Sequence, residues 1–358
     1  MGQLGEMLRL ARQRLGFTQK YAAEKIGVAQ PVLSRFENGI SHPDANFLDG
    51  ASKVYKVPKS FFHLSMPVYG PPVSVHPMTR AKSDVTARDL DMVTAELNLR
   101  AMYLRRFMEL VEFEPRSALP SLPIEEWDSP ARVATMLRAQ WALPRGPIKN
   151  LTALVERAGV VVGTSDFGGA SISGMTFRIP GQPPLVLLNS GHPSDRMRFT
   201  LAHELGHIVM HQFPTPTMEE EADRFASHFL MPDEDIKPAF QGRKVTLELL
   251  ASLKPEWRVA MQSLLMTAKR IGAVTPNQYR YLWTQISSRG WKLREPPELD
   301  LPQEQPRVMR SILQAHIDSF GFSIAELSSL AHLYEDEFSE MFSDAIGREE
   351  RPRLRIVN

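Results

Sequence analysis

The pentapeptide His203-Glu204-Leu205-Gly206-His207 is the stretch of the chain whose residue types and spacing point most directly to chemistry. On an α-helix, residues four apart lie side by side, with Cβ atoms about 5 to 6 Å apart, so the two imidazoles can reach one metal ion. Glu204 would lie beside that ion, where it can take a proton from a metal-bound water. The chain has ten histidines, and a chance match to this pattern is expected about 0.02 times. The surrounding sequence therefore has to supply the rest of a metal site.

A third protein ligand is needed, because a catalytic zinc ion usually takes three protein ligands and one water. The chain has no cysteine, which excludes disulfides and leaves histidine and carboxylates as the strong ligands. In the following helix, Glu221 lies four residues before Phe225 and so shares the side of the expected buried stripe. Relative to Glu221, Glu220 is rotated by about 100° and Glu219 by about 160°. The predicted Zn2+ ligands are His203, His207 and Glu221, with Glu220 as the runner-up.

A further histidine, His211, continues the stripe of the first two histidines. It lies eight residues from His203, or about 12 Å along a helix axis. Both side chains cannot share a tetrahedral ion with bonds of about 2.0 to 2.1 Å. We expect His211 to be exposed or to lie at the helix end.

The first 65 residues have the pattern of five short helices, with apolar residues at helical spacing between glycines and a proline. Thr18 suits a helix N-cap, and Gly27 suits the turn to the next helix. That helix would run from Gln30 to Asn38, and short polar side chains at the start of a recognition helix can meet base edges in the major groove. The same segment holds nine basic and five acidic residues. This modest positive charge favours a nucleic-acid partner, although the net charge of the whole chain is only +1.

A set of positions in this segment carries a family resemblance. They are Thr18-Gln19, Ala22-Ala23, Ile26-Gly27-Val28, Gln30, Leu33-Ser34-Arg35, Glu37-Asn38-Gly39 and Pro43. Together they resemble the XRE family of phage-repressor-type helix-turn-helix domains over about residues 3 to 64. The resemblance implies double-stranded DNA as a partner, with Gln19, Gln30 and Ser34 as candidates for DNA contacts and Arg35 and Asn38 nearer the phosphates. Pro31 departs from the small polar residue usual in the family, and so removes one base contact.

Two alternatives remain open for this module. It could serve protein contacts only, without binding an operator. Arg35 could also form an ion pair within the module, with Glu37 or Glu24, in place of a phosphate contact.

The sequence around the two histidines carries a second resemblance. Residues 198–207, 221–226 and 230–232 together resemble the ImmA/IrrE metallopeptidase family, over about residues 150 to 240. The resemblance implies a minimal zincin fold, and as substrate a repressor or antitoxin-like protein that is cut at one site. A strand at Leu185 to Asn189 would be the edge strand above the zinc helix, where an extended peptide could pair by strand addition. The same residues could also form a plain core strand, and the two roles are compatible.

The C-terminal third has an apolar helical pattern, and residues 257–296 resemble the extension often found behind this peptidase in XRE-fused members. It could pack on the peptidase, join two chains in a homodimer or sense a signal, and these roles stay open. The acidic residues between 335 and 340 and the arginines between 348 and 355 are expected on solvated helix faces.

The composition is that of an ordinary globular protein, with 43% hydrophobic and 23% charged residues among 358. No apolar run approaches the roughly 18 residues of a membrane span. The first residues show no basic segment followed by an apolar one, so we expect no secretory signal, no membrane partner and a cytoplasmic location.

The predicted fold is mainly α with a small α+β part. It comprises a five-helix helix-turn-helix domain at 1–66, a helical linker at 67–149, a minimal zincin-like metallopeptidase with a short sheet at 150–245, and a helical region at 246–358. The predicted function is a DNA-binding transcriptional regulator with a zinc-dependent endopeptidase in which Glu204 is the general base. The alternative is a DNA-binding regulator or antitoxin-like protein whose metal site is structural or inactive.

Overall fold

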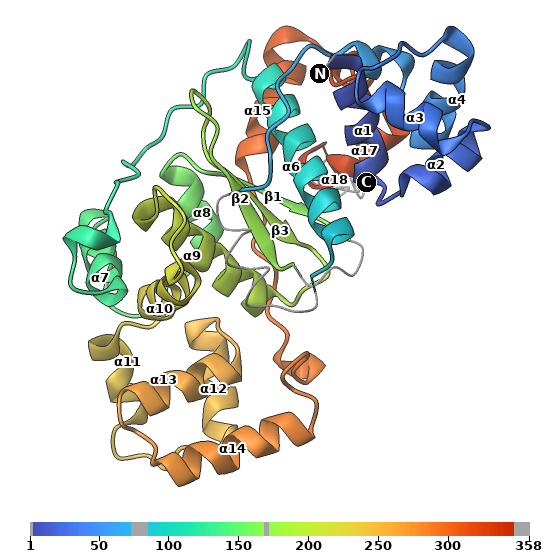
Figure 1. Cartoon of the computed structure of the whole chain (residues 1–358). Helices are drawn as coiled ribbons and strands as arrows, with labels where there is room; N and C mark the ends of the chain where they lie inside the picture. Colours follow the sequence, from blue (N-terminus) through green and yellow to red (C-terminus); the bar gives the residue numbers. More distant parts are fainter. Residues whose placement is uncertain (1–2, 73–84, 168–171, 347–358) are drawn as a thin grey trace, which may run out of the picture. The chain divides into compact units, whose positions relative to one another are not determined.

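The computed structural model describes residues 3–72, 85–167 and 172–346, and its contacts divide the chain into two compact units (Figure 1). Among the described residues, unit 1 is built from three separate stretches, 3–71, 86–113 and 306–346, whereas unit 2 holds 114–167 and 172–305. Residues 73–84 of the predicted linker and the arginines of the C-terminal tail lie outside the described residues. Within the described ranges, no helix has the length and apolar character that crossing a membrane requires.

The N-terminal module of unit 1 has the predicted succession of short helices, the last of which is a 3-10 helix. Thr18 caps the second helix, since its hydroxyl accepts a hydrogen bond from the backbone N–H of Tyr21 at 3.2 Å. Gly27 ends that helix with φ at 88°, a conformation that suits glycine. The elements are α1 Gln3–Arg14, α2 Gln19–Ile26, α3 Gln30–Glu37, α4 Ala45–Tyr55 and η1 Lys59–His63.

Unit 1 is completed by residues from the predicted linker and from the end of the chain. Helix α6 packs against α1, and the C-terminal helices join them. Arg14 pairs with Glu337, and the hydroxyls of Ser52 and Tyr334 lie 3.1 Å apart. The expectation of a solvated acidic face is therefore wrong for Glu337, because its carboxylate ties the C-terminal helices to α1. The elements are α6 Ala87–Phe107, α15 Val308–Phe320, α16 Ile324–Leu330, α17 Glu335–Met341 and α18 Ser343–Ile346.

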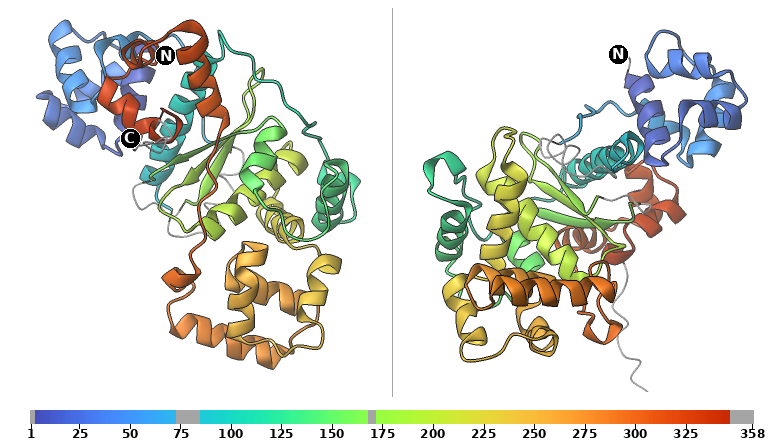
Figure 2. Two further views of the ribbon diagram at one scale, coloured as in Figure 1. Left: turned by 180° about the vertical axis from the view of Figure 1, so that it is seen from behind. Right: turned by 60° about the horizontal axis from the view of Figure 1, so that its bottom comes forward.

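Unit 2 is a helical assembly around one small sheet (Figure 2). Helices α8 and α9 pack on the strands, and α10 packs on α9 and α7. The helical elements are η2 Ile124–Glu126, α7 Pro130–Gln140, α8 Leu151–Arg157, α9 Ser194–Met210, α10 Met218–Leu230, α11 Asp233–Phe240, α12 Leu247–Trp257, α13 Met261–Arg270, α14 Pro276–Ser288 and η3 Pro297–Leu299. The strands are β1 Val161–Ser165, β2 Gly174–Phe177 and β3 Leu185–Asn189.

The three strands lie in the order β1-β3-β2. The central strand β3 runs parallel to β1, with Val161 opposite Leu185, and antiparallel to β2, with Gly174 opposite Leu188. The prediction of a strand at 185–189 is confirmed, but its place at the sheet edge is wrong. Strand β3 pairs on both sides, with β1 and with β2, and β2 takes the edge next to α9.

One continuous apolar core joins the strands and α7 to α10 with α12 to α14. Residues 246–288 therefore pack on the predicted peptidase, which was one of the roles left open for the C-terminal third. The segments at 67–149 and 246–358 are each divided between the two units. The limits of the units therefore differ from the predicted domain boundaries. The division follows from packing, because α6 and α15 bury their apolar faces in unit 1 and α7 and α12 bury theirs in unit 2.

Candidate metal site and DNA-binding surface

Helix α9 places the two predicted histidine ligands on one face, as their spacing requires. The Nε2 atoms of His203 and His207 lie 3.0 Å apart. Glu219, in the first turn of α10, directs its carboxylate to both rings. Its Oε1 lies 3.1 Å from Nε2 of His207, and its Oε2 lies 3.6 Å from Nε2 of His203. Three atoms of the kinds that bind zinc therefore converge on one point.

The geometry of this cluster fits a zinc ion. A tetrahedral ion with bonds of about 2.0 to 2.1 Å separates its ligand atoms by about 3.3 Å. The two Nε2 atoms are 3.0 Å apart, and the nearest approaches of the two carboxylate oxygens of Glu219 to them are 3.1 and 3.6 Å, which bracket that value. Oε1 of Glu219 is also buried without a hydrogen-bond donor in the protein. A bound cation would supply the partner that this oxygen lacks.

The third member of the cluster is not the predicted one. Glu221 hydrogen-bonds His211, and the exposed Glu220 pairs with Arg224 at 2.5 Å. The prediction of Glu221 rests on its place four residues before Phe225, on the side of the buried stripe. On an ideal helix, Glu219 and Glu221 flank the buried stripe on opposite sides, about 60° to 90° from its centre. The direction in which α10 crosses α9 decides that Glu219 faces the histidines.

Small residues set that direction and are the signal that could have identified Glu219. A Cβ atom on Gly206 would lie 2.9 Å from the ring of Phe225 and 3.4 Å from the Cα of Ala222. Because Gly206 has no side chain, α10 can approach α9 closely on its alanine side. Glu219 precedes Ala222 and Ala226 by three and seven residues and so lies on that side.

The carboxylates of Asp223 and Glu219 surround His203 with negative charge, which favours a cation at the cluster. Its Nδ1 lies 2.8 Å from Oδ1 of Asp223. Burial by itself would lower the pKa of His203, but the hydrogen bonds with Asp223 and Glu219 outweigh burial and raise that pKa to about 10. Burial would raise the pKa of Glu219, yet the two histidines beside its carboxylate lower that pKa to about 2. Without metal, a proton on His203 therefore balances the charge of Glu219, and a metal ion would displace that proton.

His207 is oriented by a second histidine. Its Nδ1 lies 3.0 Å from Nδ1 of His211, whose Nε2 lies 3.0 Å from Oε2 of Glu221. His211 lies just beyond the end of α9, as expected, but it is buried, not exposed. Burial and the neighbouring His207 lower the pKa of His211, so the neutral ring can accept a hydrogen bond from His207 and donate one to Glu221. Asp223, His211 and Glu221 together hold the outer nitrogens of both candidate ligands.

Glu204 lies on α9 between the two histidines and is not a member of the ligand cluster. Its side chain is buried, and its Oε2 accepts a hydrogen bond of 2.7 Å from the hydroxyl of Thr176 on β2. This contact fixes the carboxylate beneath the edge strand. Thr176 was not singled out in the sequence, because the short strand that carries it follows a turn rich in glycine and serine.

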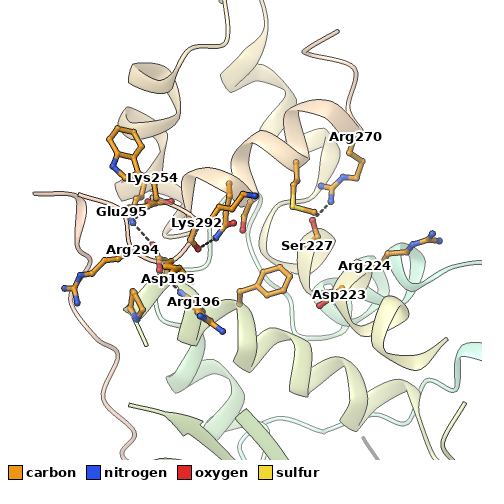
Figure 3. Close-up of a pocket in the computed structure, with 18 of the residues that line it drawn as sticks. Asp195, Arg196, Asp223, Arg224, Ser227, Lys254, Arg270, Lys292, Arg294 and Glu295 are labelled. Atoms are coloured by element: carbon orange, nitrogen blue, oxygen red, sulfur yellow. Dashed lines mark hydrogen bonds and ion pairs between the residues drawn. The ribbon is translucent and has the colours of Figure 1, made fainter. Parts of the chain in front are cut away.

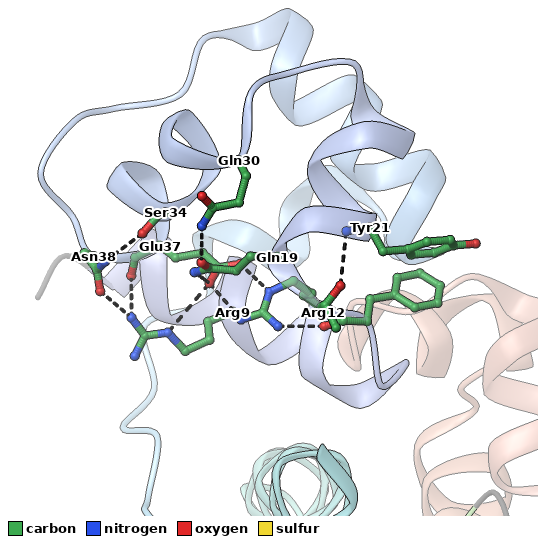
Figure 4. Close-up of polar contacts among 10 residues, drawn as sticks. Arg9, Arg12, Gln19, Tyr21, Gln30, Ser34, Glu37 and Asn38 are labelled. Carbon is green, nitrogen blue, oxygen red and sulfur yellow. Dashed lines mark hydrogen bonds and ion pairs between the residues drawn. The ribbon is translucent and has the colours of Figure 1, made fainter. Parts of the chain in front are cut away.

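Two of the candidate DNA contacts, Gln30 and Gln19, are the first residues of α3 and α2 (Figure 4). Gln30 donates a hydrogen bond of 2.8 Å to Gln19, which donates one of 2.8 Å to Glu37. Glu37 is fully buried and accepts two hydrogen bonds from Arg12, at 2.6 and 2.9 Å. Gln30 is exposed, and Gln19 is partly so. A buried ion pair therefore orients two polar side chains toward the surface.

The other three candidates lie on the same helix or directly after it. Arg35 is exposed, and its Nε donates to the backbone oxygen of Pro31 at 3.4 Å, so it does not form the alternative ion pair with an acidic residue of the module. Asn38 ends α3, accepts a hydrogen bond of 2.7 Å from Arg9 and donates one of 3.4 Å to the partly exposed Ser34. Arg9 therefore shares this surface, which sequence reasoning had not assigned to it.

Comparison with known proteins matches two parts of the chain. Residues 155–269 match the family described as the IrrE N-terminal-like domain, and residues 8–62 match the helix-turn-helix family. Over 54 residues the chain is 43% identical to the HTH-type transcriptional regulator ImmR of Bacillus subtilis (strain 168). That stretch covers 15% of this chain and 42% of ImmR, so the chain spans less than half of that curated relative.

Proposed function

Because the chain joins an XRE-type helix-turn-helix domain to an ImmA/IrrE-like peptidase domain, we propose that it is a DNA-binding regulator with a zinc-dependent endopeptidase. Its substrate is a repressor or antitoxin-like protein, and its place of action is the cytoplasm. The observation that carries the proposal is the cluster of His203, His207 and Glu219, whose spacing suits a tetrahedral zinc ion, with Glu204 buried beside it. A structural site would have no use for a carboxylate base at that position.

The residues of the site divide the work of peptide hydrolysis. A zinc ion, when bound, polarises the scissile carbonyl and makes a water molecule more acidic. Glu204 takes the proton of the attacking water and returns it to the leaving amine. Thr176 holds Glu204 in place through its hydrogen bond. Asp223 and His211 keep the histidine rings turned toward the ligand point.

The edge strand offers a place for the substrate backbone. Strand β2 pairs with β3 on one side only, and no other described strand pairs with its second side. An extended segment of the substrate can add to that side by backbone hydrogen bonds. Thr176 belongs to the same strand and contacts Glu204. A segment bound there would pass next to the proposed base.

The helix-turn-helix domain supports a role at DNA, and it would bring the peptidase to an operator. Gln19, Gln30 and Ser34 are the proposed base contacts, with Arg35 and Asn38 near phosphates. The exposed Gln30 and Arg35 and the ion pair beneath them support this assignment. A homodimer would match a two-fold symmetric operator.

The test is to co-express the protein with the repressor or toxin-like product of a neighbouring reading frame and to follow partner length by mass spectrometry. Glu204→Gln should retain zinc and fold but lose about 10² to 10⁴-fold in cleavage, the contribution of a positioned general base. Glu220→Gln is the matched control, because that carboxylate is exposed and pairs only with Arg224. Identical fragments in identical yield from wild type and Glu204→Gln would refute the peptidase. If neither cuts while both keep zinc and bind DNA, a regulator with a structural metal is the better assignment.

A further inference from the structure

A cavity of about 620 Å³ lies within unit 2, directly beside the ligand cluster (Figure 3). Helices α9 and α10 line one side, and α13 and residues 291–295 line the other. Asp223 lines the cavity with the same carboxylate that holds Nδ1 of His203. Phe199, one helical turn before His203, also lines it. Asp223 therefore belongs to the cavity lining and also contacts a candidate ligand of the cluster.

Part of the cavity wall is apolar and open. Phe199 and Trp291 line it together with Met266 and Leu293. Met266 is 54% exposed and Leu293 is 78% exposed, although large apolar side chains are usually buried. A pocket for a small molecule encloses most of its ligand. These open walls better suit a chain segment that enters at one end and leaves at the other.

Most carboxylates of the lining are paired with cations. Nζ of Lys254 lies 2.5 Å from Asp195 and 2.6 Å from Glu295, and all three side chains are buried. Arg294 pairs with Asp300 at 2.7 Å. Lys254 carries one positive charge between two carboxylates, so this buried triad keeps one negative charge, whereas the pair of Arg294 and Asp300 adds none.

Two cations of the lining have no such partner. Nη2 of Arg196 donates to the hydroxyl of Ser173 at 3.0 Å, and the ammonium of Lys292 lies 5.1 Å from the ring centre of Trp283. Within the ranges that the structure describes, neither forms an ion pair with a carboxylate. Figure 3 shows both near Asp195, at the opposite end of the cavity from Asp223. The two charges of Arg196 and Lys292 exceed the one negative charge that the Lys254 triad keeps, so the end farther from the metal ligands attracts an anion.

We propose that this cavity binds a segment of the protein substrate that carries a large apolar side chain followed, farther from the cleavage point, by an acidic residue. The apolar side chain lies against Phe199, Met266 and Trp291, and the carboxylate lies between Arg196 and Lys292. This inference rests on the proposed peptidase function and names the sequence that it selects. The helices that follow the peptidase core thereby take part in substrate choice.

The test measures binding separately from cleavage. Full-length Glu204→Gln protein is titrated into fluorescein-labelled peptides with a central Leu-Glu, Leu-Lys or Ser-Glu pair in a serine-rich background, and anisotropy reports binding. We expect the Leu-Glu peptide to bind most tightly. Adding Lys292→Glu should weaken its binding by about fivefold to tenfold and reverse the preference to Leu-Lys, because an attractive pair of charges becomes a repulsive one. Adding Met266→Ser should reduce the preference for Leu over Ser by about tenfold.

Two exposed residues outside the cavity provide matched controls. Lys269 on α13 lies over Tyr279 at 4.6 Å, the same kind of contact that Lys292 makes with Trp283. Tyr281 is 65% exposed. Lys269→Glu and Tyr281→Ser should leave both preferences unchanged.

A library of such peptides should be incubated with wild-type protein. The peptides that it cleaves should show the same preference for a Leu-Glu pair near the cleavage site. Equal binding of the three peptides, no binding of any, or equal effects of Lys292→Glu and Lys269→Glu would each overturn the proposal. If wild type cuts its partner while the peptides bind equally, the peptidase stands and this cavity is not its selective site. If the preferences hold while wild type cuts nothing, the peptide site stands and the peptidase function fails.

Discussion

Glu219 and His207 lie on different helices, and Oε1 of Glu219 is 3.1 Å from Nε2 of His207. This contact joins α10 to the zinc helix and defines the third side of the ligand cluster. The two neighbouring glutamates face elsewhere, Glu220 to Arg224 and Glu221 to His211. Three adjacent carboxylates thus have three different roles, which substitution can separate.

The ligand set makes the first prediction. Purified protein should contain one zinc ion per chain, and Glu219→Gln should lose it. Glu220→Gln should keep it. Glu221→Gln should keep it with affinity lowered by about 10 to 100-fold, the usual cost of disturbing a residue that orients a ligand. Metal content by mass spectrometry and competition with a chelator measure both quantities, and loss of metal in Glu221→Gln alone would restore the sequence-based assignment.

The pH dependence of the metal-free protein follows from the two shifted pKa values. His203 has its pKa raised from 6.5 to about 10. Its contribution to the free energy of unfolding is therefore complete below about pH 6.5 and is lost as pH rises through about 10. Glu219 has its pKa lowered from 4.5 to about 2. Its contribution to the free energy of unfolding is therefore complete above about pH 4.5 and is lost as pH falls through about 2. Chelator-treated protein should therefore lose stability toward urea between about pH 7 and 9.

The pH dependence of stability in Asp223→Asn, compared with that of wild type, tests the role of His203. Among the groups that raise the pKa of His203, the Asp223 carboxylate is the first. The variant should lose less stability than wild type over the same pH range. Parallel curves for the two proteins would contradict the His203 assignment.

Gly206→Ala tests the close approach of the two helices. Helix propensity alone would favour alanine by about 1 kcal/mol, but its Cβ would lie 2.9 Å from the ring of Phe225. Overpacking costs about 1 to 3 kcal/mol, so the variant should be less stable than wild type. Its zinc affinity should also fall, because α10 carries Glu219. Urea denaturation and chelator competition would show this, and a more stable variant with unchanged zinc affinity would refute it.

The DNA surface predicts two different effects on binding. Gln30→Ala should reduce discrimination between operator and random DNA by about 1 to 3 kcal/mol. Arg35→Ala should weaken binding to all sequences and flatten the salt dependence, as loss of a phosphate contact does. Titrations of full-length protein at several salt concentrations separate the two. Equal affinity of wild type for upstream and random DNA would exclude an operator.

Glu37 predicts an effect of the buried ion pair on both folding and recognition. Glu37→Ala would leave Arg12 without its carboxylate and Gln19 without its acceptor. Breaking a buried pair costs about 3 to 5 kcal/mol, so the unfolding temperature of unit 1 should drop. Calorimetry would measure this drop, and an unchanged unfolding transition would contradict it.

The sequence by itself determined the parts that depend on local periodicity. Spacing of four residues placed His203 and His207 on one face of a helix and left Glu204 beside them. Thr18 and Gly27 likewise set the limits of α2, because capping and positive φ are local properties.

The tertiary structure decided which residues from distant segments meet. Glu219 and Glu221 flank the same buried stripe, and only the packing of Ala222 and Phe225 against Gly206 turns one of them toward the histidines. The same holds for the edge strand, for the pairing of Arg14 with Glu337 and for the cavity beneath α13. Helical periodicity fixes the angle of a residue around its own axis. The direction in which that axis crosses its neighbour depends on the shapes of both helices, and so it is settled only when they pack.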